Sequence, residues 1–334
     1  MKVLQLICLI AAIACVPNML YAKVWRVNNV AGVTADFTNV QDAHDAASPG
    51  DTIHLEPSLI NYGNLNMSKR LVIISTGAFA VNNPGIQADL RHGTLNNVNI
   101  TNTGANGSLI SVRFTAGIDI GNGVQSITVT NCVGATPTDN ANCCGRNYIN
   151  INNADNILVT RSMVSSIIFS NSSNNIICSN NIVWGFITND GGSDAIITNN
   201  VIRAGNPNDG ASLNNCVVAN NIFNKGLNTS FTNCTVNNNF ASGTGAPPAG
   251  FTFVDMATVF ENPDGGYVDN VYRLKTGSPA IGAGQAGEDL GAFGGVNPFR
   301  LGVTPAVPSI YRLTVPASPG GSSMNIIFSA RSNN

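Results

Sequence analysis

Charged residues are scarce in this chain of 334 residues: Asp, Glu, Lys and Arg together make up 10% of it, and the formal net charge is −2. No stripe of Lys and Arg occurs that could displace counterions from phosphates, so we expect no nucleic-acid partner. Aromatic residues make up only 7%. Because 43% of the chain is nevertheless hydrophobic, the composition excludes a disordered protein and predicts a folded one.

Several catalytic and metal-binding signatures are also missing. There is no CxxC or Cys/His spacing typical of zinc, no Ser/His/Asp ordering and no glycine loop that would cradle a phosphate. Between residues 86 and 245 the sequence has no Glu and seven Asp. Side chains suited to acid–base catalysis are therefore few.

The N-terminal residues are typical of a secretory signal peptide covering 1–22. Lys2 precedes an apolar stretch, and small residues suited to cleavage end at Ala22. We expect the mature protein to begin at Lys23; lipid attachment at Cys15 is the alternative. No other apolar run approaches the ~20 residues that cross a bilayer. The sequence predicts a secreted or cell-surface protein without a transmembrane segment.

Cleavage would leave six of the eight cysteines in an oxidising compartment. Cys132 lies before an insertion at 136–146 that contains Cys143 and Cys144, so a disulfide from Cys132 to either of them would fix this loop. The other three fall within apolar patterns and are expected to be buried small hydrophobic residues: Cys178, Cys216 and Cys234.

The dominant feature is an internal repeat of about 20 residues. Five segments align, NILVTRSMV, NIICSNNIV, DAIITNNVI, NCVVANNIF and NCTVNNNFA, and their starts at 156, 175, 194, 215 and 233 are separated by 19, 19, 21 and 18 residues. The apolar residues alternate within each unit, which indicates strands, and the period is too short for a helical repeat. The repeat predicts a solenoid of stacked strands, with about eight coils between residues 71 and 240.

Three apolar columns arise when the units are stacked about 4.8 Å apart. One contains Ile157, Ile176, Ala195, Cys216 and Cys234; the second contains Val159, Cys178, Ile197, Val218 and Val236; the third contains Met163, Ile182, Val201, Ile222 and Phe240.

Asparagine is unusually abundant, with about 49 residues, and the repeat explains it. Two polar columns flank the apolar ones, and we expect their amides to form ladders between coils and their backbone to adopt the left-handed conformation at turns. The columns are Ser162, Asn181, Asn200, Asn221 and Asn239, and Asn156, Asn175, Asp194, Asn215 and Asn233.

Both ends of the repeat carry recognisable segments. Thr38 to Gln41 has the spacing of a capping box before a short helix, and a strand, Thr52 to Leu55, follows. The segment FTNVQDAHDAASPGDTIHLEPS resembles the first segment of right-handed parallel β-helix proteins of the pectin-lyase-like superfamily. YRLKTGSPAIGAG and EDLGAFGG resemble their closing segment, so the resemblance covers residues 36–297.

Characterised members of that superfamily mostly bind, cleave or epimerise acidic polysaccharides, which is what the resemblance implies here. Its lyases combine carboxylate-bound calcium with an Arg or Lys base, and its hydrolases use clustered Asp. The Gly-His-Gly and Arg-x-Lys signatures of its polygalacturonase-like members are absent.

Asp190 and Asp209 are the best candidates for catalysis or calcium binding. They are 19 residues apart, so the repeat places them on neighbouring coils about 5 Å apart. Such a pair could hold calcium, or act as the two carboxylates of a retaining glycosidase. The alternative, which we favour, is that both are turn residues whose carboxylates bond their own backbone.

Trp184 and Arg203 form a second candidate pair, also 19 residues apart. If both face outward, the indole could stack on a sugar and the guanidinium could bind a carboxylate. In the alternative, Trp184 packs on the surface and Arg203 covers it through a cation–π contact.

We therefore expect a monomeric, secreted or cell-surface β-helix without an evident active site. It would bind polysaccharide or be displayed on a polysaccharide-rich surface. The alternatives are a polysaccharide lyase or glycoside hydrolase, calcium-assisted in one form, and a structural rod. The expected organisation is a signal peptide at 1–22, a cap and first strands at 23–70, coils at 71–245, final coils and a cap at 246–300 and a β-hairpin tail at 301–334.

Overall fold

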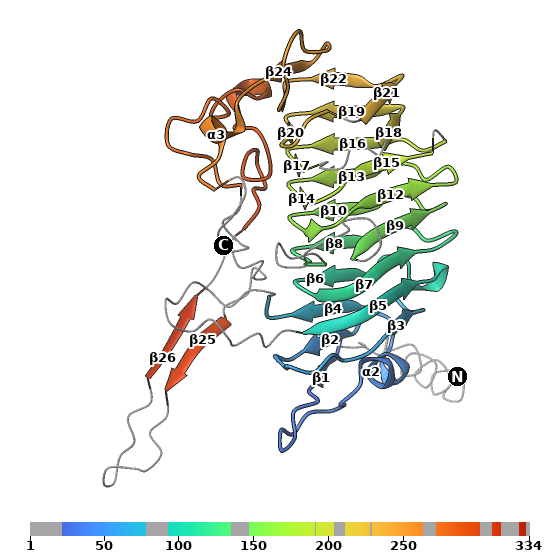
Figure 1. Ribbon diagram of the computed structural model, residues 1–334. Coiled ribbons are helices and arrows are strands. Elements are labelled where there is room, and N and C mark those ends of the chain that lie inside the picture. The colour runs from blue at the N-terminus through green and yellow to red at the C-terminus, as the bar shows by residue number, and fades with distance from the viewer. Residues whose placement is uncertain are drawn as a thin grey trace, which may run out of the picture.

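The protein is a right-handed parallel β-helix, in which successive turns of the chain stack as strands in three parallel sheets (Figure 1). The computed structural model describes residues 22–77, 93–134, 147–190, 192–203, 211–227, 229–262, 272–300, 309–314 and 327–331. Among them no helix is long and apolar enough to cross a membrane. The predicted signal peptide and the insertion at 136–146 lie outside the described residues.

The largest sheet, sheet I, has ten strands. If β1 and β2 are set aside, eight remain within residues 71–240, the number of coils that the repeat predicts. In spatial order the strands are β1 (Val24–Val27), β2 (Thr52–Leu55), β4 (Val72–Ser75), β6 (Ser108–Ile110), β8 (Thr128–Thr130), β10 (Leu158–Thr160), β13 (Ile176–Ser179), β16 (Ala195–Thr198), β19 (Cys216–Ala219) and β22 (Thr235–Asn237).

Two six-stranded sheets form the other sides of the β-helix. Sheet II contains β11 (Met163–Val164), β14 (Ile182–Val183), β17 (Val201–Ile202), β20 (Ile222–Phe223), β23 (Asn239–Ala241) and β24 (Phe251–Phe253). Sheet III contains β3 (Leu65–Met67), β5 (Thr94–Ile100), β7 (Arg113–Ile120), β9 (Tyr148–Asn152), β12 (Ile167–Ser170) and β15 (Ile187–Asn189). Two further pairs are β18 (Ala211–Asn214) with β21 (Thr229–Thr232), and the antiparallel hairpin of β25 (Ser309–Thr314) and β26 (Ile327–Arg331).

The strand register confirms the predicted repeat. In sheet I, Val159 pairs with Cys178, Cys178 with Ile197, and Ile197 with Val218. These side chains are fully buried and form the interior of the coils. Cys178 and Cys216 lie in the core as predicted, whereas Cys234, in the last coil, is only partly buried. Burial raises the pKa of the Cys216 thiol to about 12.

The predicted amide ladder runs through the core beside sheet I. Asn181, Asn200 and Asn221 are fully buried. The Nδ2 of Asn181 donates to the Oδ1 of Asn200 at 3.1 Å, and the Nδ2 of Asn200 donates to the Oδ1 of Asn221 at 3.0 Å. Ser162 begins the ladder, its backbone N–H donating to Asn181 Oδ1 at 2.9 Å, and Asn239 ends it. Each amide thus satisfies polar groups on the coils beside it.

The backbone conformation of the ladder differs from the prediction. The left-handed residues are those directly before the ladder positions, such as Asn180 with φ 56° and Asn199 with φ 54°. The prediction was wrong for the ladder itself, because a buried amide that bonds both neighbouring coils must point inward, and the turn is made by the preceding residue. In the second polar column the asparagines are left-handed as predicted, with φ 55° at Asn175 and φ 56° at Asn215, but Asp194 is not among the residues with positive φ.

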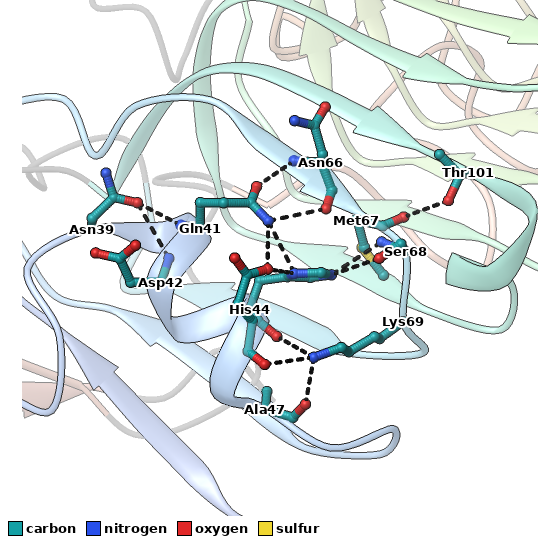
Figure 2. Close-up of polar contacts among 11 residues, drawn as sticks. Asn39, Gln41, Asp42, His44, Ala47, Asn66, Met67, Ser68, Lys69 and Thr101 are labelled. Atoms are coloured by element: carbon teal, nitrogen blue, oxygen red, sulfur yellow. Dashed lines mark hydrogen bonds and ion pairs between the residues drawn. The ribbon is translucent and has the colours of Figure 1, made fainter.

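A short helix, α2 (Val40–Ala46), covers the N-terminal end of the coils. Its N-cap is Asn39, whose Oδ1 accepts from the backbone N–H of Gln41 at 2.7 Å. The predicted capping box beginning at Thr38 is therefore displaced by one residue. The Gln41 side chain is left to reach the first coils, where its Oε1 accepts from Asn66 N at 2.8 Å (Figure 2).

The other end of α2 is tied to the coil below it. Lys69 Nζ donates to the carbonyl oxygens of His44, Asp45 and Ala47 at 2.8 to 2.9 Å, which satisfies the final carbonyls of the helix. The buried His44 ring accepts from Ser68 N through Nε2 at 3.0 Å (Figure 2). Because Nε2 is an acceptor here, the ring proton resides on Nδ1, which lies 2.8 Å from Asp45 Oδ1.

The third predicted column, from Met163 to Phe240, faces away from the interior of the coils. These residues form a second core on the outer face of sheet II, while their strand neighbours, such as Val183 and Ile202, face inward. The second core is completed by α3 (Met256–Val259) and by residues 272–299, which we call the C-terminal strap. The strap lies beside sheet II, in orange in Figure 1.

Sheet III is interrupted between β15 and β18, where the repeat spacing rises to 21 residues. Side chains replace the backbone ladder there. The hydroxyl of Thr188 donates to Ser212 O at 3.0 Å and accepts from Ser212 N at 3.1 Å. The amide of Asn189 makes the equivalent pair of bonds with Asn214 N and O, at 2.8 and 2.9 Å. The coils therefore remain joined across the break.

Candidate functional site

Asp190 lies in an exposed turn and bonds to backbone and hydroxyl groups around it. Its Oδ2 accepts from Asn171 N on the neighbouring coil at 2.5 Å, and its Oδ1 accepts from Gly192 N at 3.4 Å and from Ser193 Oγ at 3.5 Å. The bond from Gly192 N is of the kind that the turn alternative expects, whereas the shortest bond joins Asp190 to the neighbouring coil. Asp209 lies outside the described residues, so the catalytic and calcium hypotheses for the pair stay predictions.

No group of three or more His, Cys, Asp or Glu side chains able to hold a metal ion is present among the residues that the structure describes.

Trp184 and Arg203 are neighbours, as the repeat predicts. The guanidinium carbon of Arg203 lies 5.4 Å from the centroid of the Trp184 ring. The indole also contacts Tyr272 of the C-terminal strap, with ring centroids 5.6 Å apart, and its Nε1 is buried. The indole therefore packs on the second core beneath Arg203, as in the packing alternative. Carbohydrate binding by this pair stays a prediction.

Cys132 is fully buried. Its Sγ lies 3.5 Å from Leu109 O and 3.4 Å from Thr130 O, and burial raises the pKa of the thiol to about 12. Its predicted disulfide partners, Cys143 and Cys144, lie outside the described residues, so the pairing stays a prediction.

A polar surface that the sequence did not reveal covers the outer face of sheet III. Strand pairing aligns four polar residues there, which we call the outer amide row: Asn66, Asn99, Asp119 and Asn150. All four are at least partly exposed. Asn99 Nδ2 lies 3.4 Å from Asn66 Oδ1, and Asn150 Nδ2 lies 3.3 Å from Asp119 Oδ1.

Buried residues alternate with partly exposed ones along β5 next to the row, after a register shift against β7 between Leu95 and Asn97. Residues between and beside the members of the row, such as Val98, Ile118 and Ile149, are fully buried in the core. The row is therefore held by a rigid sheet, and its amides are not needed to satisfy turns. Their spare donors and acceptors face solvent.

Tyr148 adds an aromatic ring beside the row. It pairs in register with Gly117, and a Cβ at that glycine would lie only 3.0 Å from the ring. The Tyr148 ring thus lies over Gly117, where a larger residue would crowd the ring. Burial raises the pKa of Tyr148, and the negative charge of the Asp119 carboxylate raises it further.

A second set of polar contacts extends this surface along the same strands, toward the N-terminal ends of β5 and β7. Thr115 Oγ1 donates to Asn96 Oδ1 at 3.2 Å, and Asn96 Nδ2 donates to Asn64 Oδ1 at 2.8 Å. Asn61 Nδ2 reaches Thr115 Oγ1 at 3.4 Å. The outer face of sheet III is thus an extended surface of amides and hydroxyls that also carries the Tyr148 ring, the Asp119 carboxylate and Arg113.

No protein-family model matches the chain, and no curated protein matches its sequence.

Proposed function

We propose that the protein is a secreted or cell-surface β-helix that binds polysaccharide without transforming it, and that the outer face of sheet III is its binding surface. The observation that carries the proposal is the outer amide row with Tyr148 beside it. Amides donate and accept hydrogen bonds in one plane, which suits the hydroxyls of a sugar, and an aromatic ring offers an apolar surface to the face of a sugar.

An extended polymer suits this surface better than a small ligand does. The row crosses four successive strands of one sheet, β3, β5, β7 and β9, so its polar groups repeat at about 4.8 Å. Small ligands are usually enclosed by concave sites, whereas this row lies on the outside of a sheet. A chain of sugars can contact several members of the row at once.

The test is binding of the mature protein to a panel of neutral and acidic polysaccharides, measured by affinity electrophoresis and by retention on insoluble glycans. We expect Tyr148→Ala to weaken binding about tenfold, equivalent to about 1.4 kcal/mol, and Asn150→Ala to weaken it less. The matched control is Thr198→Ala, a partly exposed outward position on sheet I. The proposal fails if wild type binds no glycan or if both sheet III variants bind as wild type does.

A catalytic role for Asp190 and Asp209, as a calcium-assisted lyase or as a hydrolase, remains the alternative function. It is tested by incubation with uronic-acid polymers, with and without calcium, while unsaturated or reducing ends are followed. Product formation that is lost in Asp190→Ala would establish an enzyme. Without product, the enzyme is rejected, and failure to bind any glycan would favour a structural rod.

We also propose that this β-helix is of the pectin-lyase-like kind and that it is exported. The capping helix α2 and the stacked coils support the first proposal, and the apolar N-terminal stretch supports the second. N-terminal sequencing of the exported protein should begin at Lys23; a lipid-modified Cys15 in the membrane fraction would show the tethered alternative.

A further inference from the structure

Six residues with left-handed backbone follow successive strands of sheet I, from β6 to β19, and form one column at the edge of that sheet. We call them the turn column: Ser111, Asn131, Arg161, Asn180, Asn199 and Asn220. Each backbone N–H donates to a carbonyl of the next coil, as from Ser111 to Thr130 at 3.0 Å and from Arg161 to Ser179 at 3.2 Å. The six therefore lie on consecutive coils.

The last three members of the turn column are paired with the C-terminal strap. Asn180 Nδ2 donates to Ala292 O at 3.1 Å and to Gly294 O at 2.7 Å, and Asn199 Nδ2 donates to Asp289 O at 3.3 Å. Asn220 Oδ1 accepts from the backbone of the strap at 3.0 Å. The strap thus uses the polar groups that this half of the column presents.

Within the part of the chain that the structure describes, the first three members each have a buried polar atom without a hydrogen-bond partner: Ser111 Oγ, Asn131 Oδ1 and Arg161 Nε. Ser111 is 0% exposed and Asn131 is 4% exposed. Buried polar groups in folded proteins are nearly always hydrogen-bonded, so three such atoms on consecutive coils are unusual. They mark a place that is built for a polar partner.

The charge at this place is positive. Arg161 Nη2 donates to Thr130 Oγ1 at 3.1 Å, on the coil that carries Asn131, and Arg161 forms no ion pair among the residues that the structure describes. Burial lowers the pKa of Arg161, and the positive charge of Arg300, at the end of the strap, lowers it further. A half-buried guanidinium with no carboxylate partner among the described residues lacks the opposite charge that usually compensates its burial.

We propose that Ser111, Asn131 and Arg161 form an oxyanion-binding site that takes a carboxylate or sulfate group. The guanidinium offers its unpartnered Nε in the fork geometry that suits these groups. Ser111 offers a hydroxyl, and the Asn131 amide becomes a donor when its side chain is flipped by 180°. Arg300 adds positive potential. The site lies at the edge of sheet I beside the strap and is separate from the outer amide row.

The test compares wild type with Arg161→Gln in thermal unfolding and calorimetric titration. The probes are sulfate, phosphate, monomeric galacturonate and a galacturonate oligomer, each against chloride at equal ionic strength. We expect the affinity of wild type for the anion to fall about tenfold or more in Arg161→Gln, and Arg161→Lys to lie between them. Arg70→Gln, which removes an exposed guanidinium near the N-terminal cap, is the matched control and should bind as wild type does.

The four probes distinguish a site for a sugar carboxylate from a site for oxyanions in general. A response to galacturonate alone assigns a sugar carboxylate, and a response to sulfate and phosphate as well assigns a general oxyanion site; both support the proposal. In chloride, Arg161→Gln should be at least as stable as wild type, because an empty anion site holds an uncompensated charge. A variant that is destabilised or unfolded in chloride, an anion response equal to that of wild type, or no response in wild type overturns the proposal.

Discussion

At the N-terminal end and in the middle coils, buried polar groups are satisfied by different chemistry. Asp51, 6% exposed, holds the first strand: its carboxylate accepts from Lys23 N at 2.8 Å, Trp25 Nε1 at 2.9 Å and Ser48 N at 2.9 Å. In the middle coils the same task falls to uncharged amides such as Asn200, which bonds to the coils before and after its own.

The difference follows from symmetry along the stack. A carboxylate only accepts hydrogen bonds, so it suits a chain end, where N–H donors converge on one side. An amide donates and accepts, so each can bond the next and the pattern can repeat on every coil. The cap is therefore sensitive to pH, whereas the ladder should not be. The following predictions test this contrast.

The largest effect is expected when the ladder is broken in the middle. Asn200→Ala removes an amide that donates to Cys178 O at 2.9 Å and accepts from Asn181 N at 2.9 Å. Leaving such groups buried and unpaired should lower the free energy of unfolding by about 3 kcal/mol, measured by chemical denaturation. Asn174→Ala, at an exposed amide of the adjoining turn, should cost less than about 1 kcal/mol. Equal losses in the two variants would show that a buried ladder amide contributes no more to the free energy of unfolding than an exposed one does.

A smaller and pH-dependent effect is expected at the cap. Burial opposes ionisation of Asp51, but its N–H donors outweigh burial and hold the pKa of this carboxyl below its ordinary value. Ionised Asp51 therefore contributes stability above about pH 3.9, the ordinary Asp pKa, and the contribution is lost as the pH falls through the folded-state pKa.

Asp51→Asn should accordingly cost about 2 kcal/mol at neutral pH, and the loss should shrink in acid. Unfolding measured from pH 7 to pH 2 checks this, with Asn200→Ala as the reference, whose loss should stay constant because an amide does not titrate. A constant loss in both variants would remove the contrast between the two regions.

The smallest effect is expected where the strap meets the coils. Asn180→Gly keeps the left-handed backbone and removes two hydrogen bonds to the strap, at a cost of about 1 kcal/mol. Hydrogen exchange in residues 285–299 should become faster while the inner ladder stays protected. Asn233→Gly, at another left-handed position, is the control. Unchanged exchange in the strap would show that its apolar contacts alone hold it.

The repeat made the fold, its register and its ladder predictable, because one alignment brought apolar and amide columns together over five units. The direction of the Met163 column was not predictable from it. The strands of sheet II that carry this column are as short as two residues, and both sides of β11, β14, β17 and β20 are buried. The outer side is covered by α3 and by the C-terminal strap, which come from far along the chain.

The outer amide row escaped prediction for a related reason. Asn66 and Asn99 are 33 residues apart, and Asp119 and Asn150 are 31 apart, so loops of different length hide the column from any search at a fixed period. The alternation NVNI at 97–100 and NIN at 150–152 was the available signal. The regular units place their asparagines at turns and in the ladder, so this alternation does not by itself distinguish asparagines on an outer strand face.

The C-terminal strap has a consequence for how this array can be altered. A stack of like coils ordinarily tolerates the removal or duplication of one unit, because each unit contacts only its neighbours. Here successive residues of the strap bond to Asn180, Asn199 and Asn220 on three successive coils. The length of the strap is therefore matched to the number of coils that it crosses. Deleting residues 175–193 should leave the remaining coils stacked. The strap would then lose its bonds to Asn180 and could no longer align its other contacts with the coils.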